Sequence, residues 1–212
     1  MAVYDLEEQE QIDALKAWWR QYGTLVIAGA FALALAAAAF TGWRYWQQTR
    51  SIAAAELYLQ LRQAEAANDP KRVREVGKII AERYGSTVYG ALGGLAAARA
   101  AAVTGDRGGA RDHLRAVIAA TKMPELRDVA RLRLAGVLLD DKFYAEALKT
   151  LEEKPVESME SLYAGMKGDI LAAEGRRAEA RAQYQLALDK ANPASPGRQL
   201  TQLKLDALGD AK

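Results

Sequence analysis

Histidine and cysteine, the residues that most often bind metals or act as nucleophiles, are almost absent from the sequence. There is no cysteine, which excludes disulfides, thiolate metal sites and cysteine nucleophiles. The only histidine, His113, has no second histidine with which to complete a zinc site, and we expect it to be a surface or groove residue. No phosphate-binding glycine loop, nucleophile elbow or paired-carboxylate site is found. The sequence therefore predicts a protein without enzymatic activity, metal, cofactor or small-molecule substrate. The alternative is an enzyme with an unrecognised site, which a cofactor bound to the purified protein would support.

Five arginines are spaced four residues apart in two rows, so that each row lies on one face of a predicted helix. They are Arg107, Arg111, Arg115, Arg127 and Arg131. Such rows could bind lipid head groups or acidic proteins. Acidic residues are interleaved with them, namely Asp106, Asp112, Glu125 and Asp128. We therefore expect local ion pairs rather than a dedicated anion site, and without interleaved aromatic residues we expect no nucleic-acid binding.

The composition predicts helices that are packed through small residues. Hydrophobic residues make up 50% of the chain, with many alanines among them, whereas aromatic residues are only 8% and prolines number five. This balance favours close-packed helices over sheets, so we predict an all-α fold. The net charge of +2 is too small to require a polyanionic partner.

One segment near the start of the chain has the length and composition of a transmembrane helix. The residues between Arg20 and Arg44 carry no charge, and as a helix they would extend roughly 34 Å, enough for a hydrocarbon core of about 30 Å. Aromatic residues flank this segment on both sides and include every tryptophan of the chain. We predict a transmembrane helix over residues 21–43, with membrane-interface residues Trp18, Trp19, Tyr22, Trp43, Tyr45 and Trp46.

The alternative to a permanent span is a cleaved signal peptide, because the alanine-rich stretch contains small-x-small sites such as Ala37 to Ala39. A signal peptide would need neither the acidic leader over residues 1–20 nor the second group of aromatic residues. The charges do not decide the orientation of the helix. Basic residues stand on both sides of it, at Lys16, Arg20, Arg44, Arg50 and Arg62.

The rest of the chain reads as helices that are separated by very short breaks, and short connections produce antiparallel hairpins. The clearest breaks are Asn68-Asp69-Pro70, Gly105-Asp106, Asp140-Asp141 and Gly175. We pair helix 48–67 with 71–84, 86–103 with 107–121, 125–140 with 143–153, and 158–174 with 177–191, and we expect a C-terminal capping helix over 197–209.

The hairpins contain an internal repeat. A small residue stands four positions before a large apolar residue early in the second helix of three hairpins, from Ala110 to Leu114, from Ala147 to Leu151 and from Ala180 to Tyr184. The intervals of 37 and 33 residues are close to the period of about 34 of tetratricopeptide repeats. The chain thus resembles an α-solenoid of about four tetratricopeptide-like hairpins, and generic helical hairpins are the alternative.

Stacked repeats of this kind leave one concave face, lined by the first helix of each hairpin, that commonly receives a partner. By the same alignment, this candidate partner groove contains Leu92, Leu95, Arg99, Val129, Leu132, Leu139, Leu162 and Asp169. Ordinary packing inside the array is the alternative role for each of these residues.

The order of the parts resembles the bacterial YfgM family over nearly the full length of the chain. The resemblance rests on the acidic leader, the paired tryptophans, the alanine-rich span, the Trp-Arg-Tyr-Trp sequence at residues 43–46, the hairpins and the Tyr-Gly-Ser-Thr-Val-Tyr sequence at residues 84–89. It implies an inner-membrane protein with a cytoplasmic leader (1–20) and a periplasmic helical domain (44–212). It also implies an accessory of the SecYEG translocon that works beside the membrane-anchored chaperone PpiD on emerging secretory proteins. The alternative is a scaffold for another envelope assembly, such as outer-membrane protein insertion or cell division.

Overall fold

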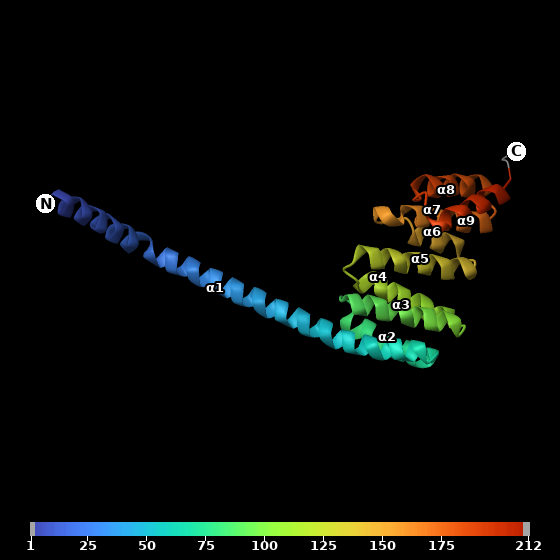
Figure 1. Ribbon diagram of the computed structural model, residues 1–212, viewed down its shortest axis with the longest axis horizontal. Coiled ribbons are helices and arrows are strands. Elements are labelled where there is room, and N and C mark those ends of the chain that lie inside the picture. The colour runs from blue at the N-terminus through green and yellow to red at the C-terminus, as the bar shows by residue number, and fades with distance from the viewer. Residues whose placement is uncertain (1–2, 210–212) are drawn as a thin grey trace. The chain divides into compact units, whose positions relative to one another are not determined.

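The computed structural model describes the backbone of residues 3–209 and the side chains of residues 11–209 except Pro196, and within these residues it is all-α (Figure 1). The acidic leader lies partly outside the described side chains. The helices are α1 (Val3–Ala66), α2 (Pro70–Tyr84), α3 (Val88–Val103), α4 (Arg107–Ala120), α5 (Pro124–Asp140), α6 (Tyr144–Thr150), α7 (Glu160–Ala173), α8 (Arg177–Lys190) and α9 (Pro196–Ala207), with the short 3₁₀ helix η1 (Glu157–Met159) before α7. The chain divides after residue 49 into two compact units, which are described separately.

The first unit consists of the part of α1 that ends at Thr49. Every residue from 11 to 49 is exposed except Gly23, including Leu25, Phe31 and Leu33, which are 68%, 67% and 74% exposed. Within the described part of the chain, α1 is the one helix that is long and apolar enough to cross a membrane. An apolar surface that no other part of the described chain covers is stable in lipid or against another membrane helix, but not in water.

The second unit contains the predicted hairpins, formed by the end of α1 with α2, α3 with α4, α5 with α6, and α7 with α8, with α9 closing the array (Figure 1). Two boundaries differ from the sequence prediction by three residues or more, and the others agree within two. No break precedes residue 48, because α1 continues through it, and α6 ends at Thr150 rather than at residue 153.

All four hairpins turn through a residue in the left-handed backbone conformation. These residues are Asn68, Gly105, Lys142 and Gly175, with φ of 52°, 82°, 63° and 86°. Their intervals are 37, 37 and 33 residues, which match the repeat that the alanines predict. The equivalent turns show that the four hairpins are copies of one structural unit.

Small residues allow the two helices of a hairpin to approach closely. A Cβ atom on Gly94 would lie 2.4 Å from Cγ2 of Val117, and one on Gly168 would lie 2.5 Å from the ring of Tyr184. The repeat alanines in the second helices, Ala110, Ala147 and Ala180, are all completely buried. Large side chains fill the spaces between these contacts, and the apolar core of the array consists of three clusters along the stack, around Ile80, Leu138 and Tyr184.

The third hairpin departs from the others because its second helix has only seven residues, against 14 in α4 and in α8. Pro155 explains the early end, since proline removes a backbone donor and its ring clashes with the preceding turn of a helix. The chain runs without helix from Glu152 to Val156. A buried polar side chain, Arg131, pairs with Glu153 in this connection.

Arg131 stands 37 residues after Gly94. It therefore occupies, in the third hairpin, the repeat position at which Gly94 makes its close contact with Val117 in the second. It is buried at 8% exposure and forms an ion pair with Asp128 at 3.4 Å and a second with Glu153. Asp128, 3% exposed, also accepts hydrogen bonds from the backbone N–H of Val156 at 2.8 Å and from the hydroxyl of Tyr163 at 3.1 Å. This buried network fastens the irregular connection to α5 and α7.

Replacing Asp128 with alanine should destabilise the protein by about 3 kcal/mol, because it leaves the Arg131 guanidinium buried without its internal partner. The measurement is urea unfolding of the full chain in detergent, followed by far-ultraviolet circular dichroism. The matched control is Asp112→Ala, because Asp112 also pairs with an arginine three residues on but is 79% exposed at its side chain, and its loss should be within about 0.5 kcal/mol. Equal effects of the two substitutions would show that the network is not a buried ion pair in solution.

Replacing Lys142 with glycine should stabilise the protein by about 1 kcal/mol, because glycine adopts the left-handed conformation without the steric penalty of a Cβ atom. The reverse change, Gly175→Ala at the equivalent turn, should destabilise it by a similar amount, since a Cβ there meets no atom within 4 Å and only the backbone conformation is strained. Unfolding midpoints of both variants test this, and changes of the same sign would contradict the equivalence of the turns.

Candidate partner-binding site

The predicted partner groove divides into residues that the core covers and residues that solvent reaches. Leu95 is 4% exposed and belongs to the central core, and Val129, Leu132 and Leu139 are partly buried against the same core. Their first role is packing. Whether their remaining exposed surface meets a partner is untested and stays a prediction.

The other predicted groove residues are more accessible. Leu92 is half-buried, Leu162 is 56% exposed, and Arg99 is exposed. Asp169 is half-buried and is already occupied, since it accepts hydrogen bonds from the Tyr184 hydroxyl at 2.8 Å and from the Lys204 ammonium at 2.7 and 2.8 Å.

The contacts of Asp169 join α7, α8 and α9 and thereby hold the capping helix in place. Burial and the Asp169 carboxylate raise the pKa of Tyr184, so its hydroxyl stays protonated and keeps donating at neutral pH. The Asp169 carboxylate therefore has a structural role in holding α9 against α7 and α8. It is less exposed than its predicted place in the partner groove suggested.

A groove of about 600 Å³ lies on the first three helices of the second unit and includes Arg99. Its walls are formed by Arg62, Glu65, Ala66, Asn68, Asp69, Pro70, Val73, Ala96, Arg99, Ala100 and Val103. Among the predicted groove residues, Arg99 alone lines it. The sequence reasoning missed Val103, which is 74% exposed, although the spacing of Ala96, Arg99 and Val103 by three and four residues is the signal of a shared helix face.

Two other grooves are likewise lined by both acidic and basic side chains. One, of about 710 Å³, lies between α2 and α4 and includes His113, whose half-buried position agrees with the prediction of a surface or groove residue. Burial and the neighbouring Lys78 lower the pKa of His113, so its imidazole is neutral at pH 7. The other, of about 330 Å³, adjoins the irregular connection at residues 152–155. Within the described residues, no group of three histidine, aspartate or glutamate side chains could hold a metal ion.

The arginine rows form ion pairs both with the interleaved acidic residues and with the next hairpin. Arg115 pairs with Asp112 and Arg131 with Asp128, each at 3.4 Å. Arg107 and Arg111 both donate to Asp141, at 2.8 and 3.1 Å, and Arg115 donates to Glu146 at 2.7 Å. The Asp141 carboxylate raises the pKa of Arg107. The predicted local ion pairs therefore form at two of the arginines, and stacking of the repeats adds pairs with the next hairpin that the sequence pattern did not indicate.

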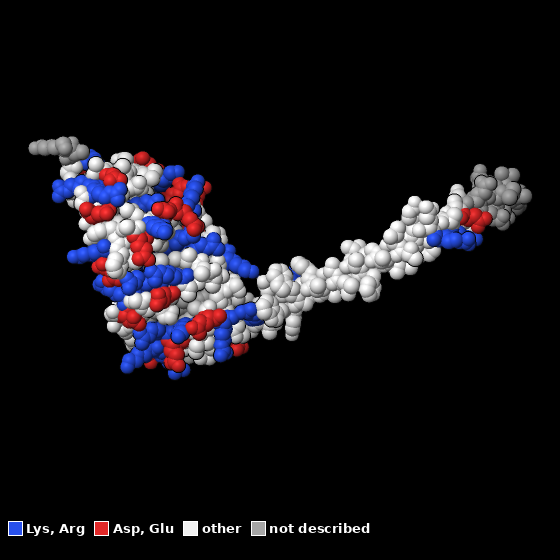
Figure 2. Space-filling view, turned by 180° about the vertical axis from the view of Figure 1, so that it is seen from behind, with Lys and Arg blue, Asp and Glu red and all other residues white. Residues whose placement is uncertain are grey.

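Figure 2 shows how the charges are distributed on one face of the protein. Acidic and basic side chains are intermingled over the helical unit, and the middle of α1 carries no charge. The intermingled charges leave no broad field of one sign on this face. Such a surface is soluble but gives little long-range attraction for a charged partner.

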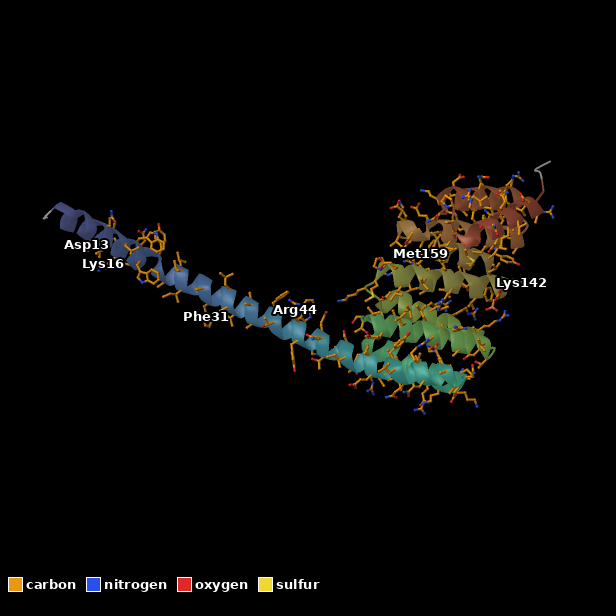
Figure 3. All side chains as sticks on the ribbon, in the orientation of Figure 1. Asp13, Lys16, Phe31, Arg44, Lys142 and Met159 are labelled. Atoms are coloured by element: carbon orange, nitrogen blue, oxygen red, sulfur yellow. The ribbon has the colours of Figure 1, made fainter. Side chains whose placement is uncertain are left out.

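The predicted membrane-interface residues form two exposed groups on α1. Trp18 lies with its ring centroid 6.3 Å from that of Trp19 and 5.8 Å from that of Tyr22. Trp43, Tyr45 and Trp46 are 53%, 74% and 53% exposed. Figure 3 labels Phe31 in the stretch between the groups and Arg44 within the second group. In the helical unit, it shows Met159 and Lys142 on opposite sides, where the helices have their opposite ends. Contact of these aromatic residues with a membrane stays a prediction.

Comparison with known proteins gives consistent matches over nearly the whole chain. The family described as Tetratricopeptide repeat-like domain matches residues 16–210. A Neisseria gonorrhoeae protein named Ancillary SecYEG translocon subunit is 30% identical over 207 residues, which cover 96% of this chain and 98% of that protein. Proteins of the same name from Aggregatibacter actinomycetemcomitans and Escherichia coli K12 are 30% and 28% identical, over 97% and 98% of this chain and 100% and 99% of theirs.

Proposed function

The chain belongs to the tetratricopeptide repeat-like family of ancillary SecYEG translocon subunits, and from this membership we propose that it is a membrane-anchored, non-enzymatic adaptor that binds other proteins at the translocon. The observation that carries the proposal is that the similarity to relatives of that name extends over 96–98% of the chain. It therefore includes the apolar helix as well as the repeats. The proposed partners are SecYEG and a membrane-anchored chaperone of the PpiD type, and the proposed clients are emerging secretory or envelope proteins.

The exposed apolar surface of α1 supports a single membrane crossing over residues 21–43. Apart from Gly23, every residue of this stretch is exposed, and one of its two threonines has its hydroxyl bonded within the helix. The hydroxyl of Thr41 donates to the carbonyl of Ala37 at 2.9 Å, so that the polar group is satisfied inside the helix. Two exposed aromatic groups at the ends of the crossing would lie at the two membrane interfaces.

The proposed orientation has the leader over residues 1–20 in the cytoplasm and the helical domain over residues 44–212 in the periplasm. The absence of cysteine fits this placement without requiring it, since the domain depends on no thiol that a periplasmic oxidant would change. The second unit has its own apolar core and is held together by ion pairs and helix packing.

The proposed mechanism is tethering. A span held at the translocon keeps the repeats near any chain that emerges there, which raises the effective concentration of the partner without a new contact. The repeats then need only moderate affinity of their own. No covalent chemistry enters this mechanism.

Deleting residues 1–43 should abolish co-purification with SecYEG, because the tether is lost, while the remaining domain keeps its helical circular dichroism. A second variant, in which residues 21–43 are replaced by an unrelated span of equal length, separates tethering in the membrane from specific contact by the span. Loss of SecYEG from this variant as well would assign the contact to the native span. Undiminished co-purification of the deletion variant would contradict the tethering proposal. Co-purification with another envelope assembly instead would favour the scaffold alternative.

The orientation can be tested with single cysteines, since the natural chain has none to remove. Gln11 and Ser86 are both exposed positions. A membrane-impermeant maleimide should label Ser86→Cys in cells whose outer membrane has been opened, and it should label Gln11→Cys only after the inner membrane is permeabilised. The reverse pattern would place the repeats in the cytoplasm.

A further inference from the structure

The first and second hairpins meet along a groove of about 710 Å³ between their second helices, α2 and α4. At one end of this joint the two helices are in close contact, since a Cβ atom on Gly85 would lie 2.9 Å from Cβ of Ala120. Nearer the other end, an ion pair at 3.2 Å connects Arg74 of α2 with Asp106, the residue that caps α4. His113, the only histidine of the chain, lies on α4 between these two contacts and lines the groove.

Fewer ion pairs cross this first joint than cross the next one. Three connect the second hairpin with the third, whereas within the described residues one connects the first with the second. In the later joint Arg115 pairs with Glu146 at 2.7 Å. The equivalent positions of the first joint, 37 residues earlier, hold Lys78 and Gly109. Since glycine has no side chain, Lys78 finds no carboxylate across the joint at this position and pairs with Glu82 of its own helix at 3.8 Å.

The imidazole of His113 is half-buried among charged groups of both helices. These groups are Lys71, Arg74, Glu75, Lys78 and Glu82 on α2, Asp112 on α4 and Asp106 before it. The helices α3 and α5 also pack against α4 but contribute no side chain to the groove. Burial and then the Lys78 ammonium lower the pKa of His113, and the carboxylates of Asp106 and Asp112 oppose them only in part. The closed joint therefore favours the neutral imidazole.

This preference for the neutral form decides the direction of the pH effect. A histidine in an opened or unfolded segment titrates near its ordinary pKa of about 6.5, whereas His113 in the closed joint binds the proton less readily. At higher pH the imidazole is neutral in both states, and the closed joint has its full stability. As the pH falls below about 6.5, the open state takes up the proton first, so the closed joint loses stability.

We propose that His113 makes the joint between the first and second hairpins responsive to pH, so that protonation of its imidazole in mildly acidic solution loosens α2 from α4 while the later joints stay closed. Repeats contact mainly their neighbours, so one joint can open without the others. The spacing of the first two hairpins, and with it the shape of the concave face, then depends on pH. This property goes beyond the proposed adaptor function and does not depend on it.

The first test is a titration of the imidazole by nuclear magnetic resonance, with isotope-labelled histidine in the full chain, in detergent and without a histidine tag. Because His113 is the only histidine, the spectrum contains one imidazole signal. Its titration midpoint should lie below that of the same protein unfolded in urea. A midpoint equal to or above that of the unfolded protein would overturn the proposal.

The second test is hydrogen exchange of the full chain at about pH 7.5 and about pH 5, on either side of the range in which histidine titrates, with rates corrected for the intrinsic effect of pH. The amides of α2 should lose protection in acid, and those of α8 in the last hairpin should keep it. His113→Gln should abolish the loss in α2, because its side chain stays neutral. An equal loss in α2 and α8 would overturn the proposal. A loss that persists in His113→Gln would do so too, in favour of the carboxylates of the groove.

Lys78→Gln gives a reading that does not require replacement of the histidine. It removes the neighbouring positive charge, so the titration midpoint of His113 should rise and the acid-dependent loss in α2 should become smaller. The matched control is Lys149→Gln, because Lys149 is also an exposed lysine on the second helix of a hairpin and lies outside the groove. It should leave both measurements unchanged. Equal effects of the two lysine variants would contradict the proposed role of this joint.

Discussion

The packing of small residues where two helices cross is the constraint on which the rest of this structure depends. Gly94 and Gly168 leave no room for a Cβ atom, and Ala110, Ala147 and Ala180 are completely buried. Close approach of the helices brings the large side chains of neighbouring repeats together in three apolar clusters and keeps the connecting turns short. The left-handed residue that each of the four hairpins uses at its turn follows from the same geometry, because a tight reversal between close helices requires positive φ.

The third hairpin shows what happens when this constraint is not met. The second helix ends early, at Thr150, and the buried pair of Asp128 and Arg131 contacts the connection that follows it, at Val156 and Glu153. Buried ion pairs add little stability over apolar packing, but they strongly penalise any arrangement that separates them. The pair therefore defines the path of an irregular connection that apolar packing alone would leave less specified.

Charge is used differently on the two sets of helices. In the second helices, arginines bridge to the carboxylates of the next repeat, as Arg111 does to Asp141, and these contacts help to fix the order of the stack. On the first helices, Arg99 is exposed at the edge of a groove that Arg62, Glu65 and Asp69 also line. In the proposed adaptor, the span would supply most of the localisation and the repeats would supply selectivity, since the intermingled surface charges provide little long-range steering.

The long apolar helix, the helical class and the repeat could be predicted from the sequence because each depends on local spacing. The uncharged stretch between Arg20 and Arg44 defines its own length, and the recurrence of small and large residues at 37 and 33 residues defines the hairpins whatever their exact packing. Even His113 could be assigned to a surface or groove, since a lone imidazole has no partners with which to form a metal site.

Only the tertiary structure decided which residues of the predicted groove are free. A pattern along the chain tells which side chains share a helix face, but burial depends on what the neighbouring repeat covers. Leu95 is therefore packed, Asp169 is tied to Lys204 thirty-five residues away, and Arg99 remains open. The same holds for Arg131, whose burial depends on Asp128 and on Glu153, twenty-two residues away, and is not evident from the spacing of the sequence.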